Sequence, residues 1–187
     1  MNYAAIKEFD IADGPGVRIS LFVSGCRHHC KGCFNAMTWD FHYGKPFTRT
    51  EEDHILELLA PAYIQGLTVL GGEPFEPENQ GAVASLLRRV RKTYPEKDIW
   101  CYTGYTYDRD LMPGGRVYTD DTEEILSLVD CIVDGEFVEE LHDVTLLFRG
   151  SSNQRLIGLH GYKPPKERER DHEILHVAGA GLQRTEM

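Results

Sequence analysis

Short apolar runs alternate with amphipathic stretches along most of this chain, and the two patterns predict different elements. Runs rich in β-branched and aromatic residues predict strands over residues 17–23, 67–70, 98–102, 131–133 and 146–148. Apolar residues at helical spacing predict three helices around residues 55–62, 83–90 and 125–129. Thr50, which precedes three acidic residues, marks the start of the first helix, because acidic side chains are favourable at the positive end of the helix dipole.

The alternation of strands and helices predicts an α/β fold made of βαβ units around a parallel sheet. Five to six strands are too few to close an eight-stranded barrel, so we expect a partial, open barrel with mostly parallel strands. In such folds the chemistry lies at the carboxyl ends of the strands. Four unusual segments directly follow predicted strands and should meet at one edge: residues 26–33, 71–74, 103–105 and 134–135.

Composition narrows the class of protein. The 187 residues suffice for one domain with a sizeable core. A formal net charge of −10 argues against a nucleic-acid binder, whose surface would be basic. No apolar run approaches the roughly 20 residues that span a membrane. The first ten residues lack a basic stretch followed by an apolar one, so we expect no secretory signal and a cytoplasmic protein.

The last part of the chain differs from the rest. Residues 163–171 are polar, of mixed charge and without apolar periodicity. Such a segment cannot bury enough apolar surface to offset the entropy of ordering it. We therefore expect one domain over residues 1–160 and a flexible polar tail over residues 161–187.

Three of the five cysteines, Cys26, Cys30 and Cys33, form a C-x3-C-x2-C run directly after a predicted strand. In a reducing compartment such clustering favours metal binding over a disulfide framework. Three thiolates on one loop can hold three corners of an iron–sulfur cube. The run supplies no fourth cysteine, so one iron would keep an open position at which a substrate could bind.

Two other interpretations of this run are a zinc knuckle completed by His28 or His29, and three unrelated thiols. We interpret both histidines as loop surface, because a further ligand would close the open position. Cys101 and Cys131 lie in apolar strand-like runs, and we expect them to be small buried core residues.

Two glycine-containing segments are candidates for ligand contact. Gly71, Gly72, Glu73 and Pro74 follow a predicted buried strand, where glycines let a ligand approach the backbone and a strand-end carbonyl can accept from an ammonium group. The alternative is an ordinary glycine turn. Residues 13–18 read D-G-P-G-V-R and form a fixed turn before the first predicted strand, which is a sufficient explanation of them by itself.

Together these motifs resemble the radical S-adenosylmethionine (radical SAM) enzymes and, within them, one family. Gly32 stands where the usual loop has an aromatic residue, and Phe34 follows Cys33, so that C-x3-C-x-G-C-F-N resembles the activating proteins of anaerobic (class III) ribonucleotide reductases. The D-G-P-G-V-R segment also resembles one found in the activating enzymes of glycyl-radical enzymes. The resemblance covers residues 2–157, with further agreement at residues 14–16, 21–26, 97–100, 103–105, 133–137 and 149–154. Residues 112–118 and the chain after Gly158 depart from the compact pattern of the family.

The resemblance implies a role for each candidate residue. Cys26, Cys30 and Cys33 would ligate a [4Fe–4S] cluster. The residues that would line the pocket for S-adenosylmethionine (SAM) are Gly32, Cys33, Phe34, Gly71, Gly72 and Glu73. Thr103 and Asp134 would lie near the methionine carboxylate of SAM, although Asp134 is also suited to cap a turn.

The resemblance also implies an activity: reductive cleavage of SAM to generate a glycyl radical on anaerobic ribonucleotide reductase, with an electron from a flavodoxin or ferredoxin. Three alternatives are an activase of another glycyl-radical enzyme, a 7-carboxy-7-deazaguanine synthase-like radical SAM enzyme, and a non-catalytic zinc or iron module. Activases of the first kind are usually longer than this chain. Gly32 before Cys33 argues against the second, and Gly71-Gly72-Glu73-Pro74 would have no purpose in the third.

Overall fold

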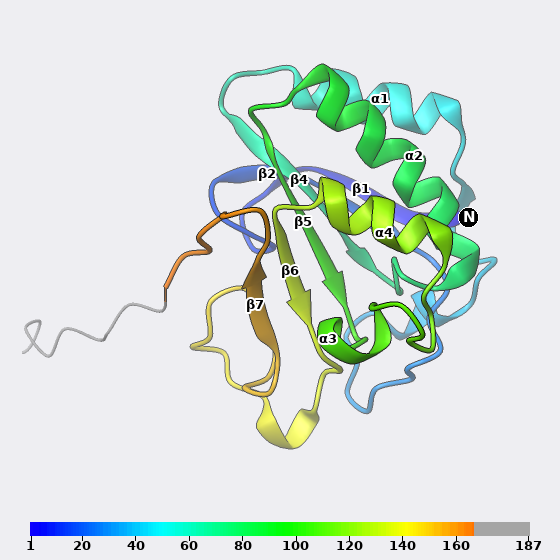
Figure 1. The fold of residues 1–187 in the computed structure, drawn as a ribbon, viewed down its shortest axis with the longest axis vertical. Helices are drawn as coiled ribbons and strands as arrows, with labels where there is room; N and C mark the ends of the chain where they lie inside the picture. Colours follow the sequence, from blue (N-terminus) through cyan, green and yellow to red (C-terminus); the bar gives the residue numbers. More distant parts are fainter. Residues whose placement is uncertain (167–187) are drawn as a thin grey trace, which may run out of the picture.

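One open seven-stranded sheet organises the chain in the computed structural model, which describes residues 1–166 (Figure 1). Most of the predicted tail, residues 167–187, lies outside the described residues. The strands, in chain order, are β1 (Asn2–Asp10), β2 (Val17–Val23), β3 (Lys45–Pro46), β4 (Ile64–Gly71), β5 (Asp98–Thr103), β6 (Cys131–Asp134) and β7 (Arg155–Gly158). Their spatial order is β3-β1-β2-β4-β5-β6-β7.

The central strands confirm the predicted α/β class. β2, β4, β5 and β6 pair in parallel, whereas β1 pairs antiparallel with β2 and β3, and β7 pairs antiparallel with β6. The sheet is thus mixed but mostly parallel in direction, with seven strands where we expected five to six. β1, β3 and β7 are the strands that the hydrophobic pattern did not predict.

The strand predicted over residues 146–148 is wrong. These residues form turns, and Phe148 has a positive φ of 55° that no strand contains. The run is apolar because it covers the second face of the sheet, where the ring of Phe148 meets that of Trp100 edge-on at 5.4 Å between centroids. The hydroxyl of Tyr102 donates to the carbonyl of Phe148 over 2.9 Å and holds the turn there.

The helices are α1 (Arg49–Leu59), α2 (Pro77–Thr93), α3 (Tyr107–Asp110) and α4 (Asp120–Leu128), with 3-10 turns η1 (Ala36–Trp39) and η2 (Glu139–Leu141). α1 begins earlier than predicted, because Thr48 and Glu51 form a capping box that satisfies the first backbone N–H groups. α3 is a single turn, too short for a periodic pattern to reveal. Within residues 1–166, no helix is long and apolar enough to cross a membrane.

Each face of the sheet packs against its own apolar cluster. α1, α2 and α4 cover one face and contribute to a cluster with Leu21, Val69, Ile99 and Cys101, all fully buried. The opposite face carries Trp100, Cys131 and Val133, covered by the 148 turn and by Tyr162. Both Cys101 and Cys131 are buried as expected. Because Tyr162 packs on Trp100, the packed part of the chain reaches at least that residue, and the boundary at residue 160 stays a prediction.

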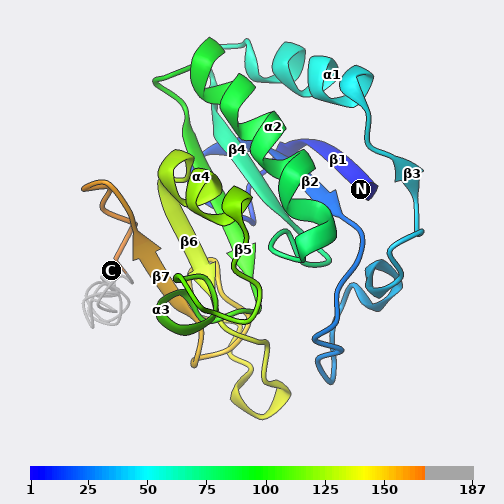
Figure 2. The ribbon, with the colours of Figure 1, turned by 45° about the vertical axis from the view of Figure 1, so that its right-hand side comes forward.

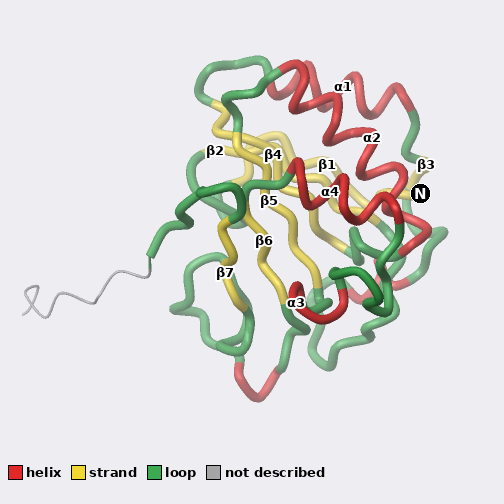
Figure 3. Tube along the Cα trace, viewed as in Figure 1, coloured by secondary structure: helices red, strands yellow, loops and turns green. Residues whose placement is uncertain are grey.

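The four parallel strands end at one edge of the sheet, the lower edge in Figure 1. The loops that follow them, drawn green in Figure 3, gather around this edge. In the view turned by 45°, the chain after β2 and the loop after β6 extend next to each other beyond this edge (Figure 2), and Lys31 of the first pairs with Glu139 of the second over 2.8 Å. The fold therefore brings the cysteine run, the Gly71–Pro74 turn and the segments after Thr103 and Asp134 to one end.

Arg18 is the last residue of the D-G-P-G-V-R segment and already belongs to β2. Its side chain is fully buried. Its Nη1 lies 2.5 Å from Oδ1 of Asp98, its Nε donates to Thr68 Oγ1 over 2.7 Å, and its Nη2 donates to the carbonyl of Leu67 over 2.9 Å. The guanidinium also lies 5.6 Å from the ring centroid of Trp100. One buried cation thus links β2, β4 and β5.

We predict that Arg18→Met lowers the free energy of unfolding by about 3–5 kcal/mol, because it leaves the carboxylate of Asp98 buried without its partner. The matched control is Arg88→Met, which removes an exposed pair with Glu124 and should cost at most about 1 kcal/mol. Urea unfolding of the metal-free chain measures both. Equal costs for the two variants would contradict the stabilising role of the buried pair.

Candidate functional site

The three clustered cysteines line one cavity of about 140 Å³ at the carboxyl ends of the parallel strands. Of the other predicted site residues, this cavity is also lined by Phe34, Gly71, Gly72, Glu73 and Thr103. It adjoins a larger cavity of about 510 Å³, and the two share seven residues: Cys30, Cys33, Phe34, Leu70, Tyr102, Phe137 and Gln154. Gly32 lines only the larger cavity. The predicted convergence of the strand-end segments is confirmed for these residues.

Backbone hydrogen bonds shape the cysteine loop. The N–H groups of Gly25 and Cys26 donate to the carbonyls of Thr38 and Trp39, over 2.7 and 3.2 Å, so the turn η1 folds back beneath the loop. The N–H of Cys33 donates to the carbonyl of Cys30 over 3.2 Å. Gly32 has a φ of +74°, which glycine adopts without strain. These backbone bonds hold this part of the loop without any contribution from its thiols.

Burial dominates the electrostatics of the thiols. It raises the pKa of Cys26 to about 12 and also raises the pKa of Cys30. A thiol with so high a pKa is protonated near neutrality and becomes a thiolate only beside a strong positive charge, such as a bound metal. Among residues 1–166, no three His, Cys, Asp or Glu side chains are grouped as ligands of a single metal ion. The three thiols are instead arranged around a common space, and this donor set fits an iron–sulfur cluster.

The expectation that His28 lies at the surface of the loop is wrong. Its side chain is only 4% exposed. Its Nε2 lies 2.9 Å from Oε2 of Glu73, its Nδ1 lies 2.7 Å from Oε1 of Glu136, and its ring stacks at 4.4 Å on Tyr105. Burial disfavours the charged ring, but the two carboxylates outweigh this and raise the pKa of His28. With both ring nitrogens engaged, His28 is not available as a metal ligand, whereas His29 packs on Trp39 at 4.5 Å.

The Gly71–Pro74 turn is attached to the cysteine loop. The N–H of Gly72 donates to the carbonyl of Val23 and the N–H of Glu73 donates to that of Gly25, each over 2.8 Å. The fully buried carboxylate of Glu73 accepts from the N–H groups of Phe75 and Gly104, over 2.9 and 2.8 Å, besides its contact with His28. Three groups of the protein thus hold that carboxylate in place at the wall of the cavity.

Thr103 and Asp134 differ in their surroundings. Thr103 lines the cysteine cavity, and its hydroxyl accepts from the N–H of Tyr105 over 3.0 Å. Asp134 lines a separate cavity of about 390 Å³, and its carboxylate accepts from Arg155 and from the N–H of Tyr107. Gly104 and Gly135 line both cavities, whereas Asp134 lines only the second. The roles of Thr103 and Asp134 toward SAM stay predictions.

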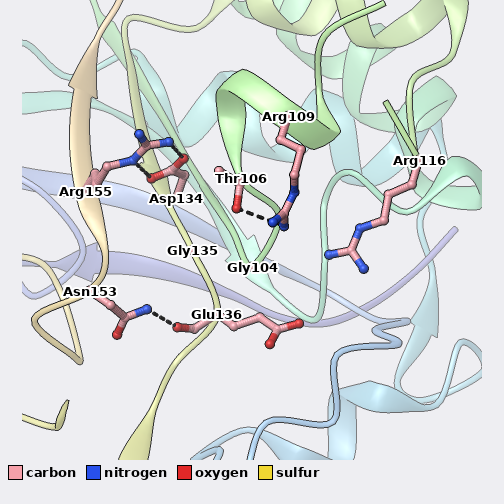
Figure 4. Close-up of a pocket in the computed structure, with 9 residues that line it drawn as sticks. All are labelled: Gly104, Thr106, Arg109, Arg116, Asp134, Gly135, Glu136, Asn153 and Arg155. Carbon is pink, nitrogen blue, oxygen red and sulfur yellow. Dashed lines mark hydrogen bonds and ion pairs between the residues drawn. The ribbon is translucent and has the colours of Figure 1, made fainter. Parts of the chain in front are cut away.

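The cavity beside Asp134 is lined by three arginines that the sequence did not single out. Figure 4 shows Arg155 paired with Asp134 on one side, and Arg109 and Arg116 on the other. Arg109 lies on α3 and Arg155 on β7, two of the elements that the hydrophobic pattern did not predict. Arg116 lies in the 112–118 segment, and its guanidinium is 4.8 Å from the ring centroid of Tyr105. A correct assignment of α3 and β7 would have pointed to Arg109 and Arg155, but not to Arg116.

Comparison with known proteins also indicates an iron–sulfur protein. The family model described as a 4Fe-4S single cluster domain matches residues 12–157. The chain is 42% identical over 156 residues to the anaerobic ribonucleoside-triphosphate reductase-activating protein of Escherichia coli (strain K12), covering 82% of this chain and 96% of that protein. The protein of the same name from Enterobacteria phage T4 is 41% identical over 156 residues (83% and 93%), and that from Haemophilus influenzae is 40% identical over 156 residues (82% and 96%).

Gly72 allows the turn and the cysteine loop to approach each other closely. A Cβ at this position would lie 2.7 Å from the carbonyl oxygen of Gly25 and 3.0 Å from that of Thr38. We predict that Gly72→Ala lowers the free energy of unfolding of the metal-free chain by about 1–3 kcal/mol, as other overpacked sites do. Gly81→Ala within α2 is the control and should be neutral or stabilising. Equal urea midpoints for Gly72→Ala and wild type would show that the two loops separate without cost.

The stability of the fold should depend on pH through Asp13. Burial, followed by the neighbouring Asp10, raises the pKa of Asp13 from 3.8 to about 7. The folded chain therefore binds this proton more tightly than the unfolded chain, and the stabilisation is lost as the pH rises toward 7. Asp13→Asn should consequently stabilise the fold at about pH 8 and have little effect at about pH 4. Urea unfolding at both pH values tests this, with the exposed Asp40→Asn as control, and an effect independent of pH would contradict it.

Proposed function

The chain belongs to the family of anaerobic ribonucleoside-triphosphate reductase-activating proteins, and on this premise we propose that it is a radical SAM activase. Its substrate would be an anaerobic ribonucleotide reductase, on which it would generate a glycyl radical. The open, mostly parallel sheet would be the partial β/α barrel of that superfamily. The observation that supports this proposal best is that the three thiols of one loop, which contains no fourth cysteine, share a cavity with Gly71, Gly72 and Glu73.

Cys26, Cys30 and Cys33 would hold a [4Fe–4S] cluster by their thiolates. When bound, such a cluster with one open iron position supplies the one-electron chemistry that cleaves SAM. The engaged ring nitrogens of His28 support a set of three protein ligands, because no further side chain of the loop competes for that position. No general acid or base of the protein is required for this reaction.

The residues around the thiols would bind and orient SAM. Gly71 and Gly72 present backbone without side chains to the cavity, so a ligand can approach it closely. Leu70, Tyr102 and Phe137 line both cavities and give them apolar walls, which favour exclusion of water from the reacting groups. Thr103 supplies a hydroxyl at the same edge. The carboxylate of Glu73, held by His28 and two backbone N–H groups, would act by positioning.

The larger cavity would admit the reacting segment of the reductase. Phe34, which lines this cavity, is 85% exposed, and Leu141 and Val144 are exposed on the segment that borders it. Exposed apolar patches of this kind mark interaction sites. We further infer a flavodoxin or ferredoxin as electron donor, and a cytoplasmic location, where low-potential donors and reduced thiols are available.

We predict that Cys26→Ser, Cys30→Ser and Cys33→Ser each abolish cluster assembly and reductive cleavage of SAM. Cys101→Ala and Cys131→Ala, which change buried core thiols away from the cavity, should retain both. Iron and sulfide per chain after anaerobic reconstitution, and release of the cleavage products, measure the two effects. Full activity in any of the three loop variants would refute the cluster assignment.

The substrate requires its own measurement. Anaerobic incubation of the reconstituted chain with SAM, a reductant and an anaerobic ribonucleotide reductase should produce the electron paramagnetic resonance signal of a glycyl radical on the reductase. The same mixture with a different glycyl-radical enzyme should not produce it. A radical on that enzyme alone would replace the proposed substrate by the alternative activase function.

A further inference from the structure

His28 lies at the centre of a short bridge of polar side chains that neither the cluster nor SAM requires as a ligand. Its ring connects Glu73, which is fully buried, to Glu136, whose side chain is half-exposed. The two contacts measure 2.9 and 2.7 Å. Charge-assisted hydrogen bonds of this length are the stronger kind, and a ring held at both nitrogens has no freedom to rotate.

The bridge joins the segments that follow all four parallel strands. His28 belongs to the cysteine loop after β2, Glu73 to the turn after β4, and Glu136 to the segment after β6. The segment after β5 is included because Glu73 accepts from the N–H of Gly104 over 2.8 Å. Within the described chain these contacts thus link every strand end that lines the cysteine cavity.

The backbone at Gly104 is shaped to admit the His28 ring. A Cβ at Gly104 would lie 2.6 Å from both Cδ2 and Nε2 of His28, closer than any real contact allows. The ring of Tyr105 covers the imidazole at 4.4 Å between centroids. Its hydroxyl lies 3.3 Å from Glu76, which in turn accepts from the N–H of Arg27 in the cysteine loop. A loop histidine that served only as solvated surface would not be enclosed in this way.

We propose that Glu73, His28 and Glu136 form a positioning bridge that fixes the cysteine loop relative to the Gly71–Pro74 turn, so that the cluster and SAM are held in register. The inference rests on the proposed function. His28 is a positioning residue and not a ligand: it acts through the placement of the thiols and of the turn backbone. Removal of a residue that orients ligands in this way typically lowers affinity or activity about 10- to 100-fold.

His28→Asn, which shortens the side chain so that it cannot reach both carboxylates, tests this together with Gly104→Ala, which displaces the ring without altering it. Both variants should retain iron and sulfide near the wild-type content but bind SAM roughly 10- to 100-fold more weakly. The readout is the change in the electron paramagnetic resonance spectrum of the reduced cluster as SAM is added. His29→Asn is the matched control, because His29 packs on Trp39 and joins no other strand end.

His28→Gln provides a conservative rescue. Glutamine can place an amide N–H near the position of Nε2 and keep the inner bond to Glu73, so it should recover most of the SAM affinity that His28→Asn loses. Wild-type SAM affinity in both His28→Asn and Gly104→Ala would overturn the inference. Loss of iron from His28→Asn with full loading of Gly104→Ala would overturn it too, by making His28 a ligand. A wild-type chain that forms no cluster would instead refute the proposed function.

Discussion

The parallel pairing of β2, β4, β5 and β6 is the constraint on which the site depends. Parallel neighbours place their carboxyl ends at one edge, so a loop after any of these strands can contact a loop after the next. The register pairs Val23 with Gly71 and Thr103 with Asp134, which are the last residues of these four strands. A change of register would move the thiols away from the glycine turn without altering any of them.

The glycines of the site allow neighbouring segments to approach each other closely. Gly72 lies against the carbonyl of Gly25, and Gly104 lies against the ring of His28, and in both places a methyl group would collide with the neighbouring segment. The glycine turn therefore has a structural role besides its proposed contact with a ligand. This second role explains why the turn hydrogen-bonds the cysteine loop through two successive N–H groups.

The sequence could predict the parts of the molecule that are periodic or clustered. The central strands and the three longer helices follow from apolar spacing, and the thiols and the glycine turn follow from their places after strands. β7 gives no clear pattern because its four residues are at most partly buried. Residues 146–148 have the pattern of a strand but are apolar for a different reason, because Phe148 covers Trp100. His28 was misinterpreted because its two partners lie 45 and 108 residues away, which no local pattern reveals.

The short strand β3 has a consequence for how the cysteine loop behaves before any cofactor binds. Residues 24–44 leave the sheet at the end of β2 and return to it at β3, which pairs with β1 through Lys45 and Pro46. The excursion is thus a closed loop anchored at both ends, whose closure entropy is lost when the sheet folds and not when iron arrives. Binding of the cofactor then has to order little additional chain, so more of the metal–thiolate bonding energy is retained as affinity.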